Sequence, residues 1–163
     1  GKVTYRKSRE GQDKAYELNI SLFSALRGTL DNSDDGLQIP RFVCAHTIMF
    51  ALEGIPAIYI HSLFGTENDH KRLEHTGRAR SINRHIWHED ELDQALNNSN
   101  AHHRVVFEQL KSLLRIRRKQ PAFHPNATQF TLHLDTQVLP FGARALIGAK
   151  VSSLLATSLM LHR

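Results

Sequence analysis

The stretch GIPAIYIHSLFG, residues Gly54–Gly65, decides the fold of this 163-residue chain. Between Pro56 and the closing glycine, the segment Ala57–His61 is short, continuous and rich in β-branched and aromatic residues. Such a run is typical of a strand with helices on both faces, because neither face then needs polar side chains. The sequence therefore predicts a buried parallel strand at Ala57–His61.

One long helix is predicted before this strand and another after it. The run RFVCAHTIMFALEG before it is apolar on nearly every face and ends at Gly54, which predicts a helix buried on several sides. The run HHRVVFEQLKSLLRIRRKQ begins at His102, and its apolar stripe consists of Val106, Leu110, Leu113 and Leu114. Its basic end complements the helix dipole and needs no nucleic acid to explain it. Shorter helices are expected in YELNISLFSALRG and at Glu89–Leu96.

The rest of the chain carries weaker signals. The first fifteen residues are charged and predict a loop, and Thr66–Trp87 is polar without a helical or strand period. A structureless stretch of that length is usually functional in a compact domain. The run TQFTLHLDTQVLPF alternates loosely and predicts the first strands of a small antiparallel domain. A parallel strand needs parallel neighbours, and no other segment suits that role, so the sequence predicts an incomplete fold.

Composition limits the classes of partner. The net charge is +5 with eleven histidines, which suits ligands carrying phosphate or carboxylate groups. The basic residues are scattered without interleaved aromatic residues, so nucleic acid is not the expected partner. The single cysteine, Cys44, cannot form an intramolecular disulfide and is expected to be a buried thiol. The polar start and the absence of a long apolar span predict a cytoplasmic protein without membrane contact.

Sequence motifs exclude several kinds of site. His85 and His88 have helical spacing, but no carboxylate completes a metalloprotease motif, so neither a metal site nor a cofactor is expected. Glycine-rich phosphate loops and GxSxG are absent. In parallel α/β barrels the active site lies at the carboxyl ends of the strands and in the loops that follow. His61 ends the predicted strand, and the loop after it carries three arginines that could bind hydroxyls, carboxylates or phosphate: Arg78, Arg80 and Arg84. A solvated basic loop fits the same spacing.

GIPAIYIHSLFG resembles the last barrel strand of the α-amylase superfamily, glycoside hydrolase family 13, and LLRIRRKQPAF is similar to its final barrel helix. The motifs YELNISLFSAL, IYIHSLFG, TGRARSINR and RKQPAFHP, in this order, resemble the branch that includes sucrose phosphorylase and glucosylglycerate phosphorylase. The resemblance covers Lys14–Phe141. It implies an α/β fold in which residues 1–121 are the C-terminal portion of a (β/α)8 barrel, with its last strand and flanking helices. Residues 122–141 would begin a small antiparallel β domain, and 142–163 would be a divergent tail.

The resemblance implies a function, namely reversible phosphorolysis of an α-glucoside of the sucrose or glucosylglycerate type. The products would include α-glucose 1-phosphate, and the substrates would be the glucoside and inorganic phosphate. Retaining chemistry uses two carboxylates about 5 Å apart. In the family these lie on earlier strands, and a third aspartate follows a histidine in a His-Asp pair that this sequence lacks. We therefore expect the catalytic acids, and the N-terminal part of the barrel, to lie outside this chain, which would be inactive alone. Two alternatives stay open, a hydrolase fragment of the amylase type and a basic module that binds sugar phosphate or nucleic acid.

The resemblance also implies roles for single residues. Arg80, in the motif RSINR, matches the arginine that holds the far hydroxyls of the buried glucosyl unit. Tyr16 and Glu17 match the mobile acceptor-side loop. Sucrose phosphorylases usually carry glutamine where Glu17 stands, so a glycerate- or glycerol-type acceptor is favoured. The residues expected to shape the loop are Asn83, Arg84 and His61.

After Phe141 the chain departs from the family pattern, which continues with a Phe-Trp-Arg-type strand and then an Asn-Val-Thr-type strand. Codons permitted by the tail, read one base earlier, can encode Trp-Arg at its start and Asn-Val-Thr near its end. The hypothesis is a shift of reading frame near Phe141. Under it the apolar run Ala145–Leu161 was never selected to pack and would be poorly ordered.

Overall fold

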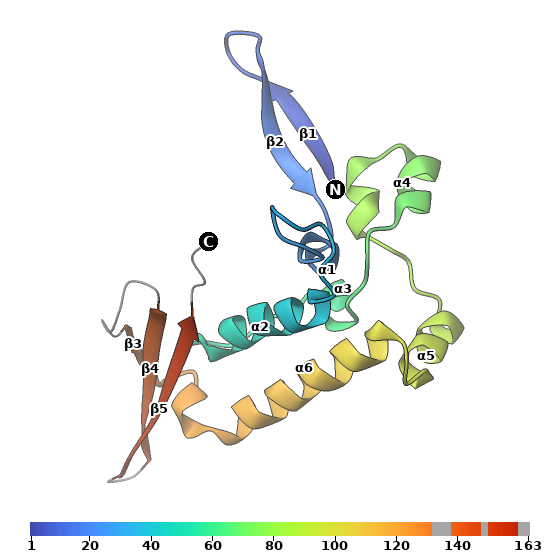
Figure 1. Cartoon of the computed structure of the whole chain (residues 1–163). Coiled ribbons are helices and arrows are strands. Elements are labelled where there is room, and N and C mark those ends of the chain that lie inside the picture. The colour runs from blue at the N-terminus through green and yellow to red at the C-terminus, as the bar shows by residue number, and fades with distance from the viewer. Residues whose placement is uncertain (132–137, 148–149, 160–163) are drawn as a thin grey trace. The chain divides into compact units, whose positions relative to one another are not determined.

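The computed structural model describes residues 1–131, 138–147 and 150–159, which form a mixture of helices and antiparallel strands (Figure 1). In chain order the elements are β1 (Lys2–Lys7), β2 (Asp13–Asn19), α1 (Leu22–Ala25), α2 (Gln38–Ala51), α3 (Ile60–Leu63), α4 (His70–Thr76), the 3-10 helix η1 (Ala79–Asn83), α5 (Glu89–Asn97), α6 (His102–Lys119), the 3-10 helix η2 (Pro121–Phe123), β3 (Thr128–Thr131), β4 (Val138–Ile147) and β5 (Lys150–Leu159). The chain forms two compact units. Unit 1 comprises Gly1–Val43 and Ile58–Gln109, and unit 2 comprises Cys44–Ala57 and Leu110–Arg163.

Unit 1 begins with an antiparallel hairpin of β1 and β2, so the expected loop at the N-terminus is wrong. The turn between the strands closes through a hydrogen bond from Gly11 N–H to the Ser8 carbonyl oxygen, 3.0 Å, and Gly11 has a φ of 80°. Glycine adopts this conformation without steric cost. The signal in the sequence was weak: the first run contains Val3, Thr4 and Tyr5 and the second only Tyr16, on either side of a glycine-containing turn.

The helix expected in YELNISLFSALRG is much shorter in the structure. Its first residues belong to β2, and α1 contains four residues, capped by the Ser21 hydroxyl, which accepts a hydrogen bond from Ser24 N–H at 3.1 Å. Phe23 on α1 anchors the core of unit 1 through an edge contact with Phe42 and a stack on His102. The buried apolar side chains of this core are Phe23, Phe42, Phe64, Ile82 and Val106.

The predicted parallel strand at Ala57–His61 is not formed. Residues 55–59 are neither helix nor strand, and α3 begins at Ile60. A strand requires a hydrogen-bonded neighbour, and no strand in the described part of the chain pairs with this segment. Several side chains of this segment are open to solvent, with Ile55 82% and Tyr59 53% exposed.

The long polar segment Thr66–Trp87 is not structureless, because it contains α4 and η1. Asp69 caps α4 by accepting a hydrogen bond from Arg72 N–H at 2.8 Å, and Gly77 ends it in a left-handed conformation. These cap signals are visible in the sequence, although the helix has only one large apolar residue, Leu73. The helices predicted at Glu89–Leu96 and from His102 are confirmed as α5 and α6.

Unit 2 contains the second half of α2, the end of α6, η2 and a three-stranded antiparallel sheet in the order β3-β4-β5. The antiparallel strands expected after Thr128 are confirmed in the described residues. The tail expected to be poorly ordered contains the end of β4 and all of β5, which pair from Val138↔Leu159 to Ile147↔Lys150. The core of this unit includes His46, Phe50, Leu110 and Ala122.

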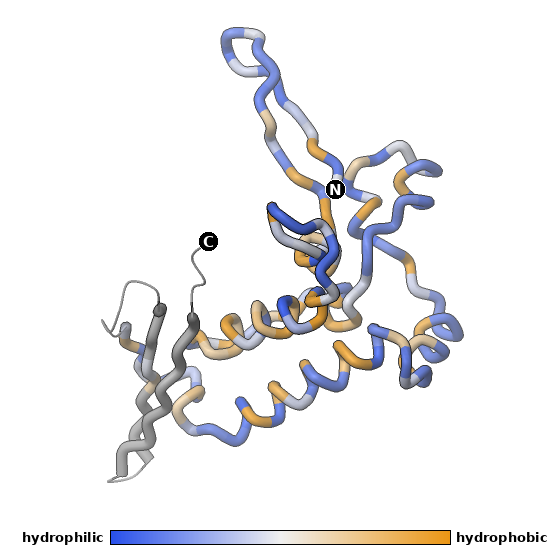
Figure 2. The backbone as a smooth tube through the Cα atoms, in the orientation of Figure 1, coloured by the Kyte–Doolittle hydropathy of each residue, from blue (hydrophilic) through white to orange (hydrophobic). Residues whose placement is uncertain are grey.

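Helix α2 is the helix predicted from RFVCAHTIMFALEG, and Figure 2 shows apolar residues along its length. It is buried along one stripe rather than on several sides, because only Phe42, His46 and Phe50, at successive intervals of four, are buried. Cys44 is exposed, so the expectation of a buried thiol is wrong.

Each compact unit is made of two separate chain segments, so the units do not coincide with the predicted division after residue 121. The division into barrel portion, β domain and tail stays a prediction. In the described ranges, every helix is too short or too polar to cross a membrane.

Candidate functional site

Unit 1 contains a groove of about 450 Å³ between the hairpin and the segment formed by α4 and η1. Three residues assigned to the site from sequence line it, namely Glu17, Arg80 and Arg84. The remaining lining residues are Thr4, Arg72, Arg78, Ala79 and Ser81. The groove therefore brings together residues more than 60 positions apart in the sequence.

Glu17 and Arg80 form a two-point ion pair across this groove. Arg80 Nε donates to Glu17 Oε2 at 3.2 Å, and Arg80 Nη2 lies 3.1 Å from Glu17 Oε1. The planar guanidinium fork matches the two carboxylate oxygens, which fixes the orientation of both side chains. Both are partly exposed, at 57% for the Arg80 side chain and 36% for that of Glu17. The pair therefore defines geometry more than it adds stability.

A β-bulge in the hairpin places Glu17. Thr4 pairs with Glu17 and Tyr5 with Ala15, so Tyr16 is the extra residue of β2. Bulges bend a strand and redirect its side chains, and they are common beside functional sites. The Tyr16 ring lies under the Arg6 guanidinium, 3.4 Å from its carbon, and does not line the groove. The structure therefore unites Glu17 with Arg80 but does not bring Tyr16 to them.

Thr76 fixes the turn that carries the arginines. Its hydroxyl donates to the Arg72 carbonyl oxygen at 2.8 Å, lies 2.7 Å from the Ser81 hydroxyl, and accepts from Arg78 N–H at 3.3 Å. The N–H of Gly77 closes α4 on the Leu73 carbonyl oxygen at 2.9 Å. Sequence reasoning missed Thr76 and Arg72, which carry no motif of their own. The cap signals of α4 were the one available indication that this segment is ordered.

Asp69 braces the same segment from its other side. Its carboxylate caps α4 and contacts His85 Nδ1 at 2.7 Å, while its backbone N–H donates to the Ile82 carbonyl oxygen at 2.7 Å. Burial raises the pKa of Asp69, but the hydrogen bonds from Arg72 N–H and His85 outweigh it and hold the pKa below 3.8. A charged carboxylate is thus part of the scaffold that holds η1.

His61 and Asn83 line a separate pocket of about 180 Å³ together with Tyr59 and Ser62. Two buried polar atoms in it, His61 Nδ1 and Asn83 Oδ1, have no hydrogen-bond partner in the structure. Asn83 Nδ2 reaches the Ile20 carbonyl oxygen at 3.5 Å. Burial, followed by the nearby His85, lowers the pKa of His61, so the neutral ring is favoured. The expected loop-shaping residues are therefore divided between two hollows, with Arg84 in the groove.

Two histidines at the start of α6, His102 and His103, serve in packing and hydrogen bonding. His102 stacks on Phe23 and contacts the Gly65 carbonyl oxygen at 3.1 Å, and His103 contacts the Phe64 carbonyl oxygen at 2.7 Å. Within the described ranges, no three histidine, cysteine or acidic residues are grouped so that they could hold a metal ion.

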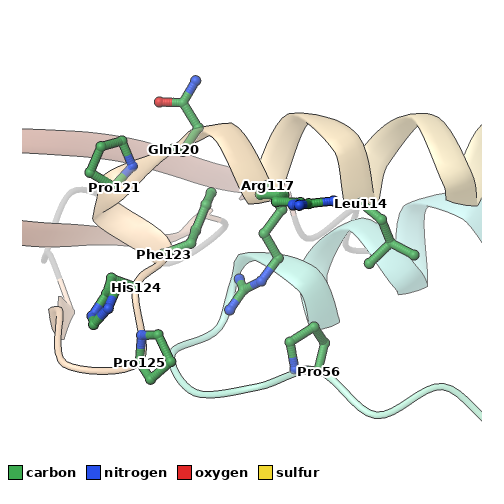
Figure 3. Close-up of a pocket in the computed structure, with 9 residues that line it drawn as sticks. Pro56, Leu114, Arg117, Gln120, Pro121, Phe123, His124 and Pro125 are labelled. Atoms are coloured by element: carbon green, nitrogen blue, oxygen red, sulfur yellow. The ribbon is translucent and has the colours of Figure 1, made fainter.

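Unit 2 has a pocket of its own, of about 440 Å³, at the end of α6 (Figure 3). Its lining is mostly apolar and includes Leu114, Phe123 and three prolines. The one buried cation, Arg117, points from α6 to the end of α2, where it donates to the carbonyl oxygens of Phe50, Leu52 and Gly54. These bonds commit the Arg117 guanidinium to the end of α2. The groove in unit 1 is the candidate site.

The sequence is similar to several sugar phosphorylases. It is 39% identical over 139 residues to a glucosylglycerate phosphorylase of Allomeiothermus silvanus, covering 85% of this chain and 25% of that protein. Identity to the glucosylglycerate phosphorylase of Escherichia coli K12 is 34% over 140 residues, again 85% of this chain and 25% of that protein. A sucrose phosphorylase of Agrobacterium vitis is 34% identical over 109 residues, 67% of this chain and 19% of that protein. The chain thus spans about a quarter of the length of the first two relatives.

The fold is similar to a solved structure, that of sucrose 6F-phosphate phosphorylase from Thermoanaerobacter thermosaccharolyticum. The TM-score is 0.66 at 23% identity, over 94% of this chain and 28% of that one. At this identity the similarity concerns the fold alone, a mixture of helices and strands. No protein-family model matches the chain.

Proposed function

Because the chain belongs to the sucrose and glucosylglycerate phosphorylase branch of glycoside hydrolase family 13, we propose that it supplies part of a glucoside phosphorylase. In this proposal residues 1–121 are the C-terminal portion of a (β/α)8 barrel, and residues 122–141 begin a small antiparallel β domain. The unpaired and partly exposed segment at residues 55–59, which overlaps the predicted strand Ala57–His61, supports this placement, because that strand could form once parallel neighbours were present.

The proposed reaction is reversible phosphorolysis of an α-glucoside to α-glucose 1-phosphate with retention of configuration. The observation that carries it is the two-point contact between Glu17 and Arg80 in one groove. By resemblance, Arg80 would contact the glucosyl unit and Glu17 the acceptor. Because both residues line one groove, a glucoside could contact both at once. The departure at position 17 from the glutamine usual in sucrose phosphorylases supports a glycerate- or glycerol-type acceptor over fructose.

We further propose that this chain binds but does not catalyse. Retaining transfer needs two carboxylates about 5 Å apart, one as nucleophile and one as acid. Among the residues that line the groove, Glu17 is the single carboxylate, and Arg80 occupies both of its oxygens. The nucleophile and the acid would then come from the N-terminal part of the barrel, and the reaction requires no metal or cofactor.

Two assays test the proposal. First, the 163-residue chain is incubated with phosphate and glucosylglycerate or sucrose, and we expect no α-glucose 1-phosphate; turnover would contradict the missing acids. Second, residues 14–141 replace the matching segment of the Allomeiothermus silvanus glucosylglycerate phosphorylase. We expect this chimaera to form α-glucose 1-phosphate from glucosylglycerate, with kcat/KM lowered about 100-fold or more by Arg80→Ala, as for loss of a charged hydrogen-bonding group. A folded chimaera that releases only glucose would point to a hydrolase, and one with no activity would refute the assignment.

Two further parts of the proposal concern the whole protein. The reading-frame hypothesis for residues 142–163 is tested by the nucleotide sequence of the gene, because only particular codons restore the family pattern one base earlier. A cytoplasmic location is a further proposal, and fractionation of cells that express the protein would test it.

A further inference from the structure

We propose that the outer edge of β5 is an interaction surface for a second copy of this chain. The β5 strands of the two copies pair antiparallel, with Leu155 of one copy opposite Leu155 of the other. This pairing joins two three-stranded sheets into one sheet of six strands. The proposal rests on unit 2 alone and stands whether or not the parent enzyme is a phosphorylase.

One edge of the sheet in unit 2 is already covered. Its outer strand there, β3, is four residues long, and the chain at the end of α2 lies along it. The Gln129 N–H donates to Glu53 Oε2 at 3.3 Å, and the Glu53 N–H donates to Gln129 Oε1 at 3.3 Å. Gln129 Nε2 also donates to the Ala51 carbonyl oxygen at 3.1 Å. A further strand could join at β3 only by breaking these bonds.

The opposite edge, formed by β5, is open in the described ranges. Strand β5 pairs with β4 over ten residues, and no other strand of those ranges pairs with it. Figure 1 shows β5 as the outer strand beside β4. The short helix η2 contacts β4 more extensively than β5, which places it over a face of the sheet and not along this edge. An edge strand of this length presents a row of unpaired backbone N–H and C=O groups.

The sequence of β5 contains none of the features that usually protect an edge. Proteins blunt such edges with charged residues, proline, bulges or very short strands. Residues Val151–Leu159 include no charged residue, no proline and no glycine, and the one charge of the strand is its first residue, Lys150. The register with β4 continues without a shift, so β5 has no bulge that turns it away. The edge is therefore suited to pairing with another strand.

The order of residues in β5 favours a copy of the same strand as the partner. The run VSSLLATSL, Val151–Leu159, has the same order of apolar and hydroxyl-bearing residues when read in either direction. In an antiparallel pair centred on Leu155, the opposed residues are Val151 and Leu159, Ser152 and Ser158, Ser153 and Thr157, and Leu154 and Ala156. Apolar residues thus stand opposite apolar ones and hydroxyls opposite hydroxyls, and such cross-strand pairs stabilise a sheet.

Backbone geometry allows this register. In an antiparallel pair, residues whose N–H and C=O groups point toward the partner alternate along each strand. A strand paired with its own copy must therefore match odd-numbered residues with odd-numbered ones, and even with even, as the pairing centred on Leu155 does. The two Lys150 residues lie beyond opposite ends of the paired segment, so their charges are not brought together.

The pairing closes after two copies. Each copy contributes its open edge, and the two edges left at the outside of the joined sheet are those of β3, which Glu53 and Gln129 cover. A two-fold pairing that uses the same surface on both copies gives a closed dimer and not a fibre.

The first experiment measures mass and amide exchange of the 163-residue chain over a range of protein concentrations. By sedimentation equilibrium we expect twice the 18.6 kDa of one chain at high concentration and a single chain on dilution. On dilution, every second amide of β5 should lose protection against hydrogen exchange, because the other amides stay bonded to β4.

Three results would overturn the proposal. These are a chain that stays monomeric, growth into larger assemblies, and a dimer without the alternating loss of protection. A monomer in which all β5 amides are protected would show that another segment of this chain covers the edge.

The second experiment tests the register with pairs of charges. In the double variant Ser153→Glu with Thr157→Lys, opposite charges face each other twice across the dimer, and we expect the dimer dissociation constant to fall about 3-fold or more. In Ser153→Glu with Thr157→Glu, like charges face each other, and it should rise about 3-fold or more. The matched control is Ser153→Glu with Ser158→Lys, which carries the same charges at positions that are not opposed and should change the constant by less than about 2-fold. Equal dissociation constants for the first two variants would overturn the proposal.

The even-numbered positions repeat this test on the other face of the sheet, because neighbouring residues of a strand point to opposite faces. If the variants at Ser153 fail to fold, Ser152→Glu with Ser158→Lys is compared with Ser152→Glu with Ser158→Glu, with the same expected directions. The exchange pattern of the unsubstituted chain decides the case even if every charged variant fails to fold.

Discussion

Arg117 Nη2 donates a hydrogen bond of 2.6 Å to the carbonyl oxygen of Gly54, three residues beyond the end of α2. The same guanidinium reaches two further carbonyl oxygens, those of Phe50 and Leu52, and Arg117 as a whole is only 8% exposed. A helix leaves its last carbonyl groups without partners, and its carboxyl end carries partial negative charge. One buried cation on α6 therefore completes the end of α2.

Replacing Arg117 by methionine should open the end of α2. The variant keeps apolar volume but leaves three carbonyl groups without a donor, each worth about 1 kcal/mol or more. We expect hydrogen exchange of the amides in the last turns of α2 and α6 to accelerate about 10- to 100-fold. The control is Arg118→Met, since Arg118 is the exposed neighbour, and it should change exchange by less than about 3-fold. Equal effects of the two substitutions would contradict the capping role.

Gly65 should be less tolerant of alanine than Gly77. Both glycines have positive φ, 57° and 63°, so alanine strains the backbone at each by about 1 kcal/mol. A Cβ at Gly65 would also lie 3.1 Å from Val106 Cγ2, whereas nothing lies within 4 Å at Gly77. We expect Gly65→Ala to destabilise unit 1 by about 1–3 kcal/mol more than Gly77→Ala, as overpacking does. Hydrogen exchange of core amides measures the difference, and equal effects would show that Val106 moves aside freely.

Unit 1 should lose stability as the pH falls below about 6.5. Burial, followed by His85, lowers the pKa of His61, and burial, followed by His103, lowers that of His102, from an ordinary value of 6.5. Above 6.5 both histidines are neutral in the folded and unfolded chain, and their full contribution is present. As the pH falls through 6.5, the unfolded chain takes up protons first, so stability is lost until the folded-state pKa values are reached.

Histidine titrations followed by NMR should therefore give midpoints below 6.5 for His61 and His102. In the double variant His61→Asn with His102→Asn, the protection of core amides against exchange, relative to the unfolded chain, should vary less between pH 7.5 and 5.5. Midpoints at or above 6.5 would contradict the prediction.

Asp69→Ala should loosen α4 and η1 together. The substitution removes the cap on Arg72 N–H and the contact with His85, and a lost cap costs about 0.5–2 kcal/mol. Asp69→Asn keeps a capping oxygen and should cost less. Because the pKa of Asp69 lies below 3.8, its contribution is present above that pH and is lost as the pH falls through the lowered value. Exchange at the Arg72 and Leu73 amides measures both variants, and equal exchange in both would assign the effect to the charge instead of the cap.

Sequence alone predicted the features that depend on local patterns. The long helix α6 follows from its apolar stripe, and the antiparallel strands after Thr128 follow from alternation. Arg80 and Glu17 were assigned by motif resemblance, and the structure brings them together. Arg72 was out of reach, because it belongs to no motif and lines the groove only through the way in which α4 and η1 pack beside the hairpin.

The wrong predictions share one physical cause: strand formation and burial depend on which other segments pair with or pack against a segment, and these are not visible in its local sequence. Ala57–His61 has the composition of a central strand, but a strand forms only where a neighbour accepts its hydrogen bonds. The start of the chain is the opposite case. Its two strands are charged and polar, but they form because each supplies the backbone hydrogen-bond partners of the other across the hairpin. Cys44 was expected to be buried from the apolar character of α2, and burial depends on what packs against the helix.

The extra residue at Tyr16 has a consequence for how this site can change over time. With the bulge, Glu17 stands opposite Thr4 and faces the groove, while Ala15 stands opposite Tyr5. Removal of one residue from β2 would shift the alternation and turn the carboxylate to the other side of the hairpin. A single-codon deletion would thus separate Glu17 from Arg80 without changing either residue. Libraries that vary the length of β2 can therefore reach ligand preferences that point substitution cannot.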